Sequence, residues 1–318
     1  MVNLRSSFKL KLFLISILLV NFIWASLSIN TVNKSISVSK SSISKLEIAK
    51  QTWLAKADYM VEAERDKLLA AHGLTSNNLI SQPLVIEIYK FILGFITAIG
   101  VGVAKHTKSI TNTFVETEIT LVEIQQLANE IFVGPICKHV EILNSNICEA
   151  AICEDYRFST CYLMLNQSFF IMNLFSLSHL RAVLQHEYAH ILYEDNFKTL
   201  LLKLTIWFYS KQSILKQSLE TDLYPLRRAC ETRADIYAAV NSPDHGLKLM
   251  EFLEKVKLHE PMLIDCNKAI AQFKLSKKRR LDSVNCSSLE AVTTHPATSD
   301  RIKLLKQIKT ELNIAAKK

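Results

Sequence analysis

The sequence is poor in the two residues that make tight turns, with only 6 glycines and 6 prolines among 318 residues. A β-sandwich or β-barrel needs many such turns, so this scarcity favours helices. A hydrophobic content of 49% excludes a disordered chain. The 7 cysteines form no C-x-x-C pair, which argues against a zinc ribbon or a complete disulfide framework. The net charge of +8 is spread along the chain without an aromatic-basic repeat, so we expect no nucleic-acid partner.

A basic flank and an apolar run stand near the beginning of the sequence. Arg5, Lys9 and Lys11 precede an uncharged stretch that extends from Leu12 to about Leu27. This order is typical of a signal peptide or a signal-anchor helix. Residues 1–30 are therefore predicted to be one or the other, with the uncleaved anchor slightly favoured. Either directs the chain to a membrane, which we expect to be a bacterial inner membrane.

Residues 31–82 are predicted to form an amphipathic helical segment. Its long helix, at 42–72, places Trp53 and other apolar side chains on one face and is followed by Gly73 as a C-cap. We expect this helix to pack on the domain or on its own copy.

A second apolar stretch at 83–104 is about long enough to cross a bilayer. Its three glycines suit close helix contacts in lipid, whereas Glu87 and Lys90 would be costly at the bilayer centre. A transmembrane helix is favoured over a buried or interfacial hairpin. Basic residues flank this stretch equally on both sides, so they do not decide its orientation.

The pentapeptide H-E-Y-A-H at 186–190 carries the clearest chemical signal. The apolar spacing around it predicts a helix buried on one side, with Ser176 or Ser178 as its cap. Positions four apart lie side by side on a helix, so His186 and His190 could share one zinc ion, and Glu187 beside them could handle a proton. By itself the motif is also compatible with a helix that carries two ordinary histidines.

A catalytic zinc needs a third protein ligand and an open position for water. The segment R-R-A-C-E-T-R-A-D places Glu231 and Asp235 four positions apart, on a helix that we expect to begin at Pro225. Glu231 suits the third ligand, and Asp235 suits an acid behind it that orients a histidine or an arginine. In isolation, the same acids would be interpreted as a surface salt-bridge row with Arg228 and Arg233.

A third pattern, T-H-P-A-T-S-D-R-I, covers residues 294–302. Pro296 is expected at the entry to a final amphipathic helix. His295 could donate a hydrogen bond to an oxyanion, and Arg301 could brace a buried acid. Alone, these residues are equally compatible with a loop histidine and a solvated arginine.

In this order, the patterns H-E-x-x-H, E-x-x-A-D and T-H-P-x-x-x-x-R-I resemble the membrane-associated zinc metallopeptidases of the HtpX and type-1 CAAX prenyl protease group. The resemblance covers roughly residues 115–312. It implies three ligands for one zinc ion (Zn2+) per chain, which are His186, His190 and Glu231. It also implies that Glu187 is the general base and acid and that His295 stabilises the transition state. Asp235, partnered by Arg301, would lie behind the ligands.

The resemblance also implies the fold class, mainly α within an α+β arrangement. We expect a gluzincin-type metallopeptidase domain at 105–318, mostly helical with a small sheet beside the active-site helix, preceded by the N-terminal membrane segments. The upstream sequence fits this domain and predicts, in order, a helix at 118–132, a strand at His139–Leu143, and a hairpin of Cys161–Leu165 with Ser168–Met172.

Two stretches are not explained by the resemblance. The segment I-C-E-A-A-I-C at 147–153 stands where the family has its motif for the substrate-binding edge strand, so the substrate preference is not defined. The apolar segment Leu200–Tyr209 is too short to span a bilayer and could dip into the membrane interface or cover the active site.

The sequence therefore predicts a membrane-associated zinc endopeptidase that acts in protein quality control or processing. Its expected partners are protein or peptide substrates and the lipid membrane. The odd number of cysteines weakly favours a catalytic domain on the reducing, cytoplasmic side. The alternative is a catalytically inactive relative that serves as a membrane scaffold or chaperone, and a membrane protein with coincidental motifs would bind no zinc.

Overall fold

The computed structural model describes residues 44–79, 83–107, 110–112, 114, 119–132, 134, 137–145, 150–166, 176–210, 221–259 and 296–317. The predicted N-terminal segment 1–30 and the predicted strand 168–172 lie outside the described residues. The helices are α2 (Lys45–Ala71), η1 (Ser76–Asn78), α3 (Pro83–His106), α4 (Leu121–Ile131), α6 (Leu177–Leu192), α7 (Asp195–Ser210), α9 (Tyr224–Asn241) and α11 (Thr298–Ala316). The strands are β1 (Ile110–Thr111), β2 (His139–Ser145), β3 (Ala151–Asp155) and β4 (Thr160–Asn166).

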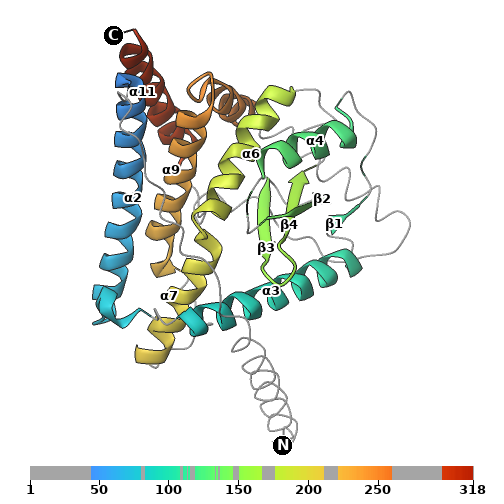
Figure 1. Ribbon diagram of the computed structural model, residues 1–318, viewed down its shortest axis with the longest axis vertical. Coiled ribbons are helices and arrows are strands. Elements are labelled where there is room, and N and C mark those ends of the chain that lie inside the picture. The colour runs from blue at the N-terminus through green and yellow to red at the C-terminus, as the bar shows by residue number, and fades with distance from the viewer. Residues whose placement is uncertain are drawn as a thin grey trace, which may run out of the picture. The chain divides into compact units, whose positions relative to one another are not determined.

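The described chain is mostly helical with one small mixed sheet, which confirms the predicted fold class (Figure 1). By its contacts the chain divides into two compact units. The larger unit, residues 43–79 and 90–318, contains the sheet and the helices that pack around it.

The sheet has the strand order β1-β2-β4-β3. β2 and β4 are parallel, with Val140 opposite Cys161, and they confirm the two strands predicted at 139–143 and 161–165. β3 runs antiparallel to β4 and is joined to it by a short turn, in which Ser159 adopts a φ of 50°. Among the described strands, β3 therefore stands at one end of the sheet, where it contacts α6.

α6 lies between the sheet and the helical layer (Figure 1). Leu184 and Ile191 face a core cluster that also contains Leu163 of β4, while Ala182 and Val183 face α9 and its neighbours. The helix begins after Ser176, one of its two predicted caps. Because both sides of α6 are covered by packed elements, side chains that project between α6 and α9 are held in a protected environment.

α6 and α9 pack closely because small side chains line their contact. Ala182 of α6 and Ala238 and Ala239 of α9 belong to one core cluster and are all almost completely buried. Pro225 stands in the first turn of α9, where its missing N–H and fixed φ suit a helix start, as predicted. This close approach brings the chemically active faces of the two helices together.

α2 packs on α9 and α11, which confirms the prediction that this helix packs on the domain. Trp53 and Ala57 are buried in the cluster that contains Ile236 of α9 and Ile308 of α11. Burying an aromatic side chain of this size stabilises the fold by roughly 3 kcal/mol. The helix ends before Gly73, whose φ of +69° is a conformation that glycine adopts at little cost.

From Lys90 onward, α3 belongs to the larger unit and is fastened to the rest of that unit. Lys90 forms an ion pair with Glu194 at 2.7 Å, and Lys105 forms one with Glu141 of β2 at 2.6 Å. Between them, Gly94 approaches the β3–β4 turn so closely that a Cβ there would lie 2.6 Å from Asp155 Oδ1. The absence of a side chain at Gly94 thus permits this contact.

Candidate metal centre

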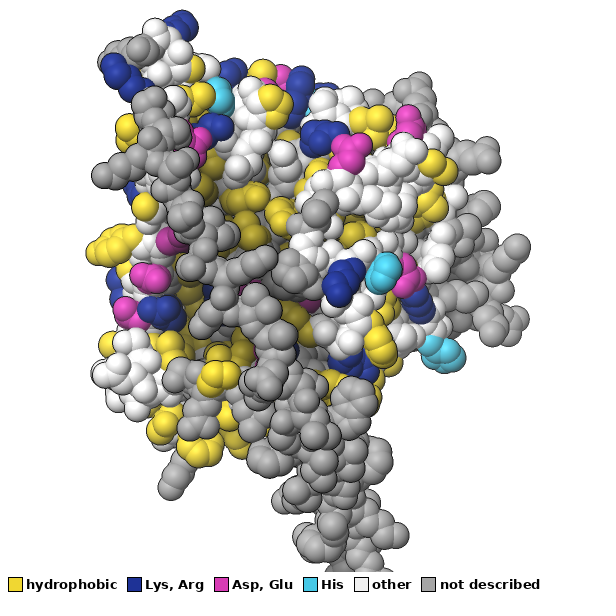
Figure 2. Space-filling model, in the orientation of Figure 1, with side chains coloured by type: hydrophobic (Ala, Val, Ile, Leu, Met, Phe, Trp, Pro, Cys, Tyr) yellow, Lys and Arg dark blue, Asp and Glu magenta, His cyan; other side chains and the backbone are white. Residues whose placement is uncertain are grey.

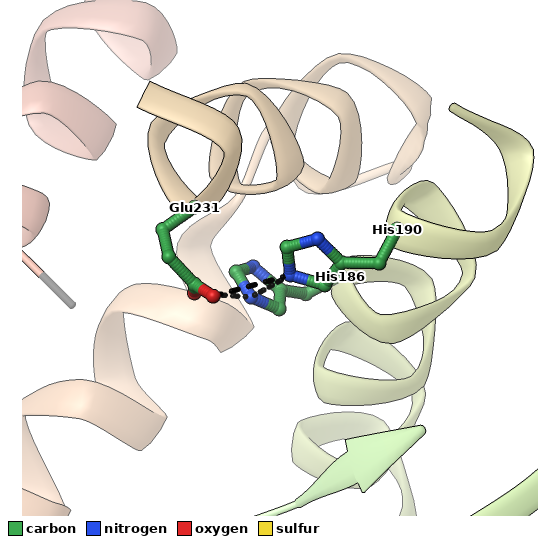
Figure 3. A group of neighbouring side chains, drawn as sticks. All are labelled: His186, His190 and Glu231. Carbon is green, nitrogen blue, oxygen red and sulfur yellow. Dashed lines mark hydrogen bonds and ion pairs between the residues drawn. The ribbon is translucent and has the colours of Figure 1, made fainter. Parts of the chain in front are cut away.

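Three side chains of metal-ligand type converge where α6 faces α9 (Figure 3). His186 and His190 come from successive turns of α6, and Glu231 comes from α9. His186 Nε2 lies 3.1 Å from Glu231 Oε2 and 3.3 Å from His190 Nε2, and His190 Nε2 lies 3.5 Å from Glu231 Oε1. Ligand atoms placed tetrahedrally around zinc are about 3.3 Å apart, because each bond is about 2.0–2.1 Å long. These separations are close to those between the ligand atoms of a zinc ion, so the three side chains could hold one.

Asp235 lies one turn after Glu231 and stands behind the first histidine. It is fully buried, and its Oδ1 lies 2.9 Å from His186 Nδ1. Arg301 of α11 donates to both carboxylate oxygens, at 2.7 and 2.8 Å. Burial alone would raise the pKa of Asp235, but Arg301 and His186 hold it at about 2. A charged carboxylate at this place orients the imidazole so that Nε2 faces the other ligands.

The electrostatic environment of the cluster favours a bound cation. Burial opposes protonation of both histidines, but the neighbouring acids outweigh it. Asp235 and Glu231 raise the pKa of His186 to about 9. Glu231 and Asp195 raise the pKa of His190 well above its ordinary value. In the absence of a metal, bound protons would give His186 and His190 their positive charge. A metal ion must displace these protons when it binds.

Glu187 occupies a buried position on α6, directly after the first histidine. It is 7% exposed, and its charge contributes to the raised pKa of His190. Tyr188, the next residue, instead packs edge-on against Phe132 of the α4 region, with ring centroids 5.7 Å apart. Successive helix residues point in different directions, and this places the acid near the cluster and the tyrosine in the core.

The structure brings together six of the seven predicted site residues, which are His186, Glu187, His190, Glu231, Asp235 and Arg301. The seventh, His295, lies outside the described residues. Pro296 precedes α11 and Arg301 stands in its first turns, so the predicted final helix is confirmed.

The sequence did not reveal a second carboxylate, which supports His190. Asp195 is the first residue of α7, and its Oδ2 lies 2.8 Å from His190 Nδ1. Arg233 of α9 donates to the other oxygen of the same carboxylate. The interpretation of Arg233 as part of a surface salt-bridge row is wrong, because this side chain is buried. The only local signal was an acid five positions after the second histidine.

β3 contributes a further buried acid that the sequence did not reveal. Glu154 is 2% exposed, and Asn196 donates to its Oε2 at 2.9 Å and to the backbone carbonyl of Ile152 at 3.3 Å. Burial raises the pKa of Glu154 to about 7, although Asn196 and the charge of His190 act in the opposite direction. An acid near its midpoint of ionisation at neutral pH therefore lies beside the cluster.

Comparison with known proteins bears on the same region. Neither the curated proteins nor the solved structures contain a match to this chain. A family model does match, from Met164 in β4 to Lys309 in α11, and it therefore spans α6, α9 and all three candidate ligands. The matched family is peptidase family M48, and the match at residues 164–309 supports a metallopeptidase of that family.

Proposed function

We propose that the protein is a membrane-associated zinc endopeptidase of the M48 type, related to the HtpX and type-1 CAAX prenyl protease group, that hydrolyses proteins or peptides. In this proposal His186, His190 and Glu231 bind one zinc ion. The observation that carries it is the convergence of these three ligand atoms at the spacing of a zinc site, within the region that matches the peptidase family.

The residues of the chain would divide the work as follows. A zinc ion held by the three ligands would polarise the scissile carbonyl of the substrate and lower the pKa of a bound water towards neutrality. Glu187, buried beside the ligands, would accept a proton from the attacking water and return it to the leaving amine. His295 would donate a hydrogen bond to the oxyanion. Asp235 and Arg301 would keep His186 in its ligating orientation.

The position of β3 suits a peptide substrate. Among the described strands it stands at the end of the sheet, next to the helix that carries Glu187. An edge strand can pair with the backbone of an extended peptide, and such pairing recognises a chain without requiring one particular side chain. This geometry supports proteins or peptides as the substrate class.

Exposed apolar side chains support membrane association. α3 contains one stretch, Val85–His106, that is long and apolar enough to cross a bilayer. Its side chains Phe95, Ile99 and Val103 recur at every fourth position and are about half exposed. Figure 2 is drawn in the orientation of Figure 1. It shows hydrophobic side chains gathered at the lower left of this face, where Figure 1 places the end of α7. There the exposed Trp207–Tyr209 segment combines aromatic rings that favour a membrane interface.

The decisive experiment compares the full-length protein with its Glu187→Gln variant in detergent micelles. Zinc content is measured by elemental analysis, and hydrolysis is measured with an unfolded protein substrate. We expect about one zinc per chain in both proteins and hydrolysis only in the parent, because the amide cannot accept the proton. Glu130→Gln, a matched change at an exposed glutamate of α4 that pairs with Arg181, should retain both properties.

Each other outcome supports a different interpretation of this protein. Zinc without hydrolysis in the parent would support the inactive scaffold or chaperone. A folded parent without zinc would make the motifs coincidental. Hydrolysis by Glu187→Gln would exclude the proton-transfer role of this residue.

A further inference from the structure

Asp195 is held in place by the backbone before it and by two side chains. Glu194 adopts a φ of +54°, which breaks the helix between α6 and α7 and lets the chain turn back. Asp195 then begins α7, where the positive end of the helix dipole favours a carboxylate. Its two oxygens have different partners, because Oδ2 faces His190 Nδ1 and Oδ1 accepts from Arg233.

Arg233 is fixed on three sides. The side chain is 5% exposed, and its guanidinium stacks on the ring of Tyr193 with a carbon-to-centroid distance of 4.0 Å. One amino group donates to Asp195, and the other donates to Asp58 of α2 at 3.3 Å. Because both amino groups of the planar guanidinium are bound, Arg233 holds the carboxylate of Asp195 in a fixed position.

The two histidines of the cluster are therefore supported in the same manner. Behind His186 the order is imidazole, Asp235, then arginine from α11. Behind His190 the order is imidazole, Asp195, then arginine from α9. The second series continues to another acid, Asp58, which belongs to α2 and precedes the region matched by the peptidase family.

The geometry points to Asp195 and Arg233 as positioning residues for His190, with Asp58 of α2 completing their support, so that zinc affinity depends on a helix outside the matched peptidase region. This inference rests on the proposed function, because it requires that His190 bind zinc. Removal of a residue that orients a metal-bound histidine typically lowers metal affinity about 10-fold to 100-fold. We expect this loss for Asp195→Asn, which keeps the shape of the side chain and removes its charge. A smaller loss, by a factor of a few, is expected for Asp58→Asn, since that side chain is 47% exposed.

The experiment measures the dissociation constant of Zn2+ by competition with a chromogenic chelator, using the full-length protein in detergent. The visible spectrum of the Co2+-loaded protein reports the geometry of the ligands. Thermal unfolding of the metal-free protein is measured in parallel. Asp66→Asn is the matched control, because Asp66 also lies on α2 but its ion pair is with Arg65 at the surface.

The expected result is weaker zinc binding and an altered cobalt spectrum in Asp195→Asn, weaker zinc binding in Asp58→Asn, and neither change in Asp66→Asn. A purely structural ion pair would instead lower the unfolding temperature of the metal-free protein and leave zinc affinity and the cobalt spectrum unchanged, which would overturn the inference. An unchanged zinc affinity in Asp58→Asn alone would remove α2 from the network. If the parent protein binds no zinc, the proposed function itself is wrong. Asp58→Asn changes a half-exposed residue, so the test remains decisive if Asp195→Asn does not fold.

Discussion

Replacing Glu154 by glutamine should stabilise the metal-free protein in a strongly pH-dependent manner. Burial raises the pKa of this acid from 4.5 to about 7. The folded state therefore prefers the protonated acid, whose stabilising effect is complete below pH 4.5 and is lost as the pH rises through 7. One pKa unit corresponds to about 1.4 kcal/mol, so ionisation of Glu154 costs the folded state about 3 kcal/mol at pH 8. At pH 5 the cost is about 1 kcal/mol or less.

Glutamine has the shape of the protonated acid and can still accept the hydrogen bond from Asn196. The gain in the free energy of unfolding from Glu154→Gln should therefore be about 2 to 3 kcal/mol larger at pH 8 than at pH 5. Urea denaturation of the full-length protein in detergent, with a chelator present, measures this difference. Glu62→Gln, at an exposed position of α2, controls for the loss of one surface charge. An equal effect of Glu154→Gln at both pH values would refute the assignment of Glu154 as a buried, protonated acid.

Two further predictions concern the packing of α3 and the protons of the metal cluster. Gly94→Ala should lower the free energy of unfolding by about 1–3 kcal/mol, because the new Cβ would meet Asp155 Oδ1 at 2.6 Å. Gly100→Ala lies in the same helix, and its new Cβ would meet no atom of the described residues within 4 Å, so it should be neutral or stabilise by up to about 1 kcal/mol. Equal losses at the two sites would contradict the packing of α3 on the β3–β4 turn. The raised pKa of His186 stabilises the metal-free protein fully below about pH 6.5, and this contribution disappears as the pH rises through about 9. Thermal stability between pH 6 and pH 9.5 should therefore decline more steeply for chelated protein than for zinc-loaded protein, and parallel curves would argue against a shared site for protons and zinc.

The helices of the metal centre could be predicted from sequence because their signals are local. Four-residue spacing places His186 beside His190 and Glu231 above Asp235 on any regular α-helix. Pro225 marks a helix start for equally local reasons. The order of the three motifs then suggested which helices meet, since one metal ion needs ligands from more than one element.

The residues that support His190 could not be predicted in this way. Asp195 and Arg233 lie far apart in sequence, and their contact depends on the turn at Glu194 and on the close packing of α6 and α9. Asp58 is further still from Arg233 and meets it only because α2 packs on α9. No periodicity within one segment encodes such a contact.

β3 illustrates a different difficulty. Its sequence A-I-C-E-D is short and ends in two acids, which are uncommon in strands, so composition alone argues against a strand there. Both Glu154 and Asp155 are nevertheless almost completely buried. Asn196 donates to one oxygen of the first acid, and Arg157 donates to both oxygens of the second, so the strand depends on partners that only the folded chain supplies.

The placement of α2 also has a consequence for how the chain is made. Its residues are synthesised well over a hundred residues before its core partners in α9 and α11. Domains form as their segments are synthesised at about 5–20 residues per second, and contacts between distant segments slow folding. The apolar face around Trp53 must therefore remain without its native partners for on the order of ten seconds or more. During that interval the nascent chain exposes an apolar surface, which becomes buried only when α9 and α11 have been synthesised.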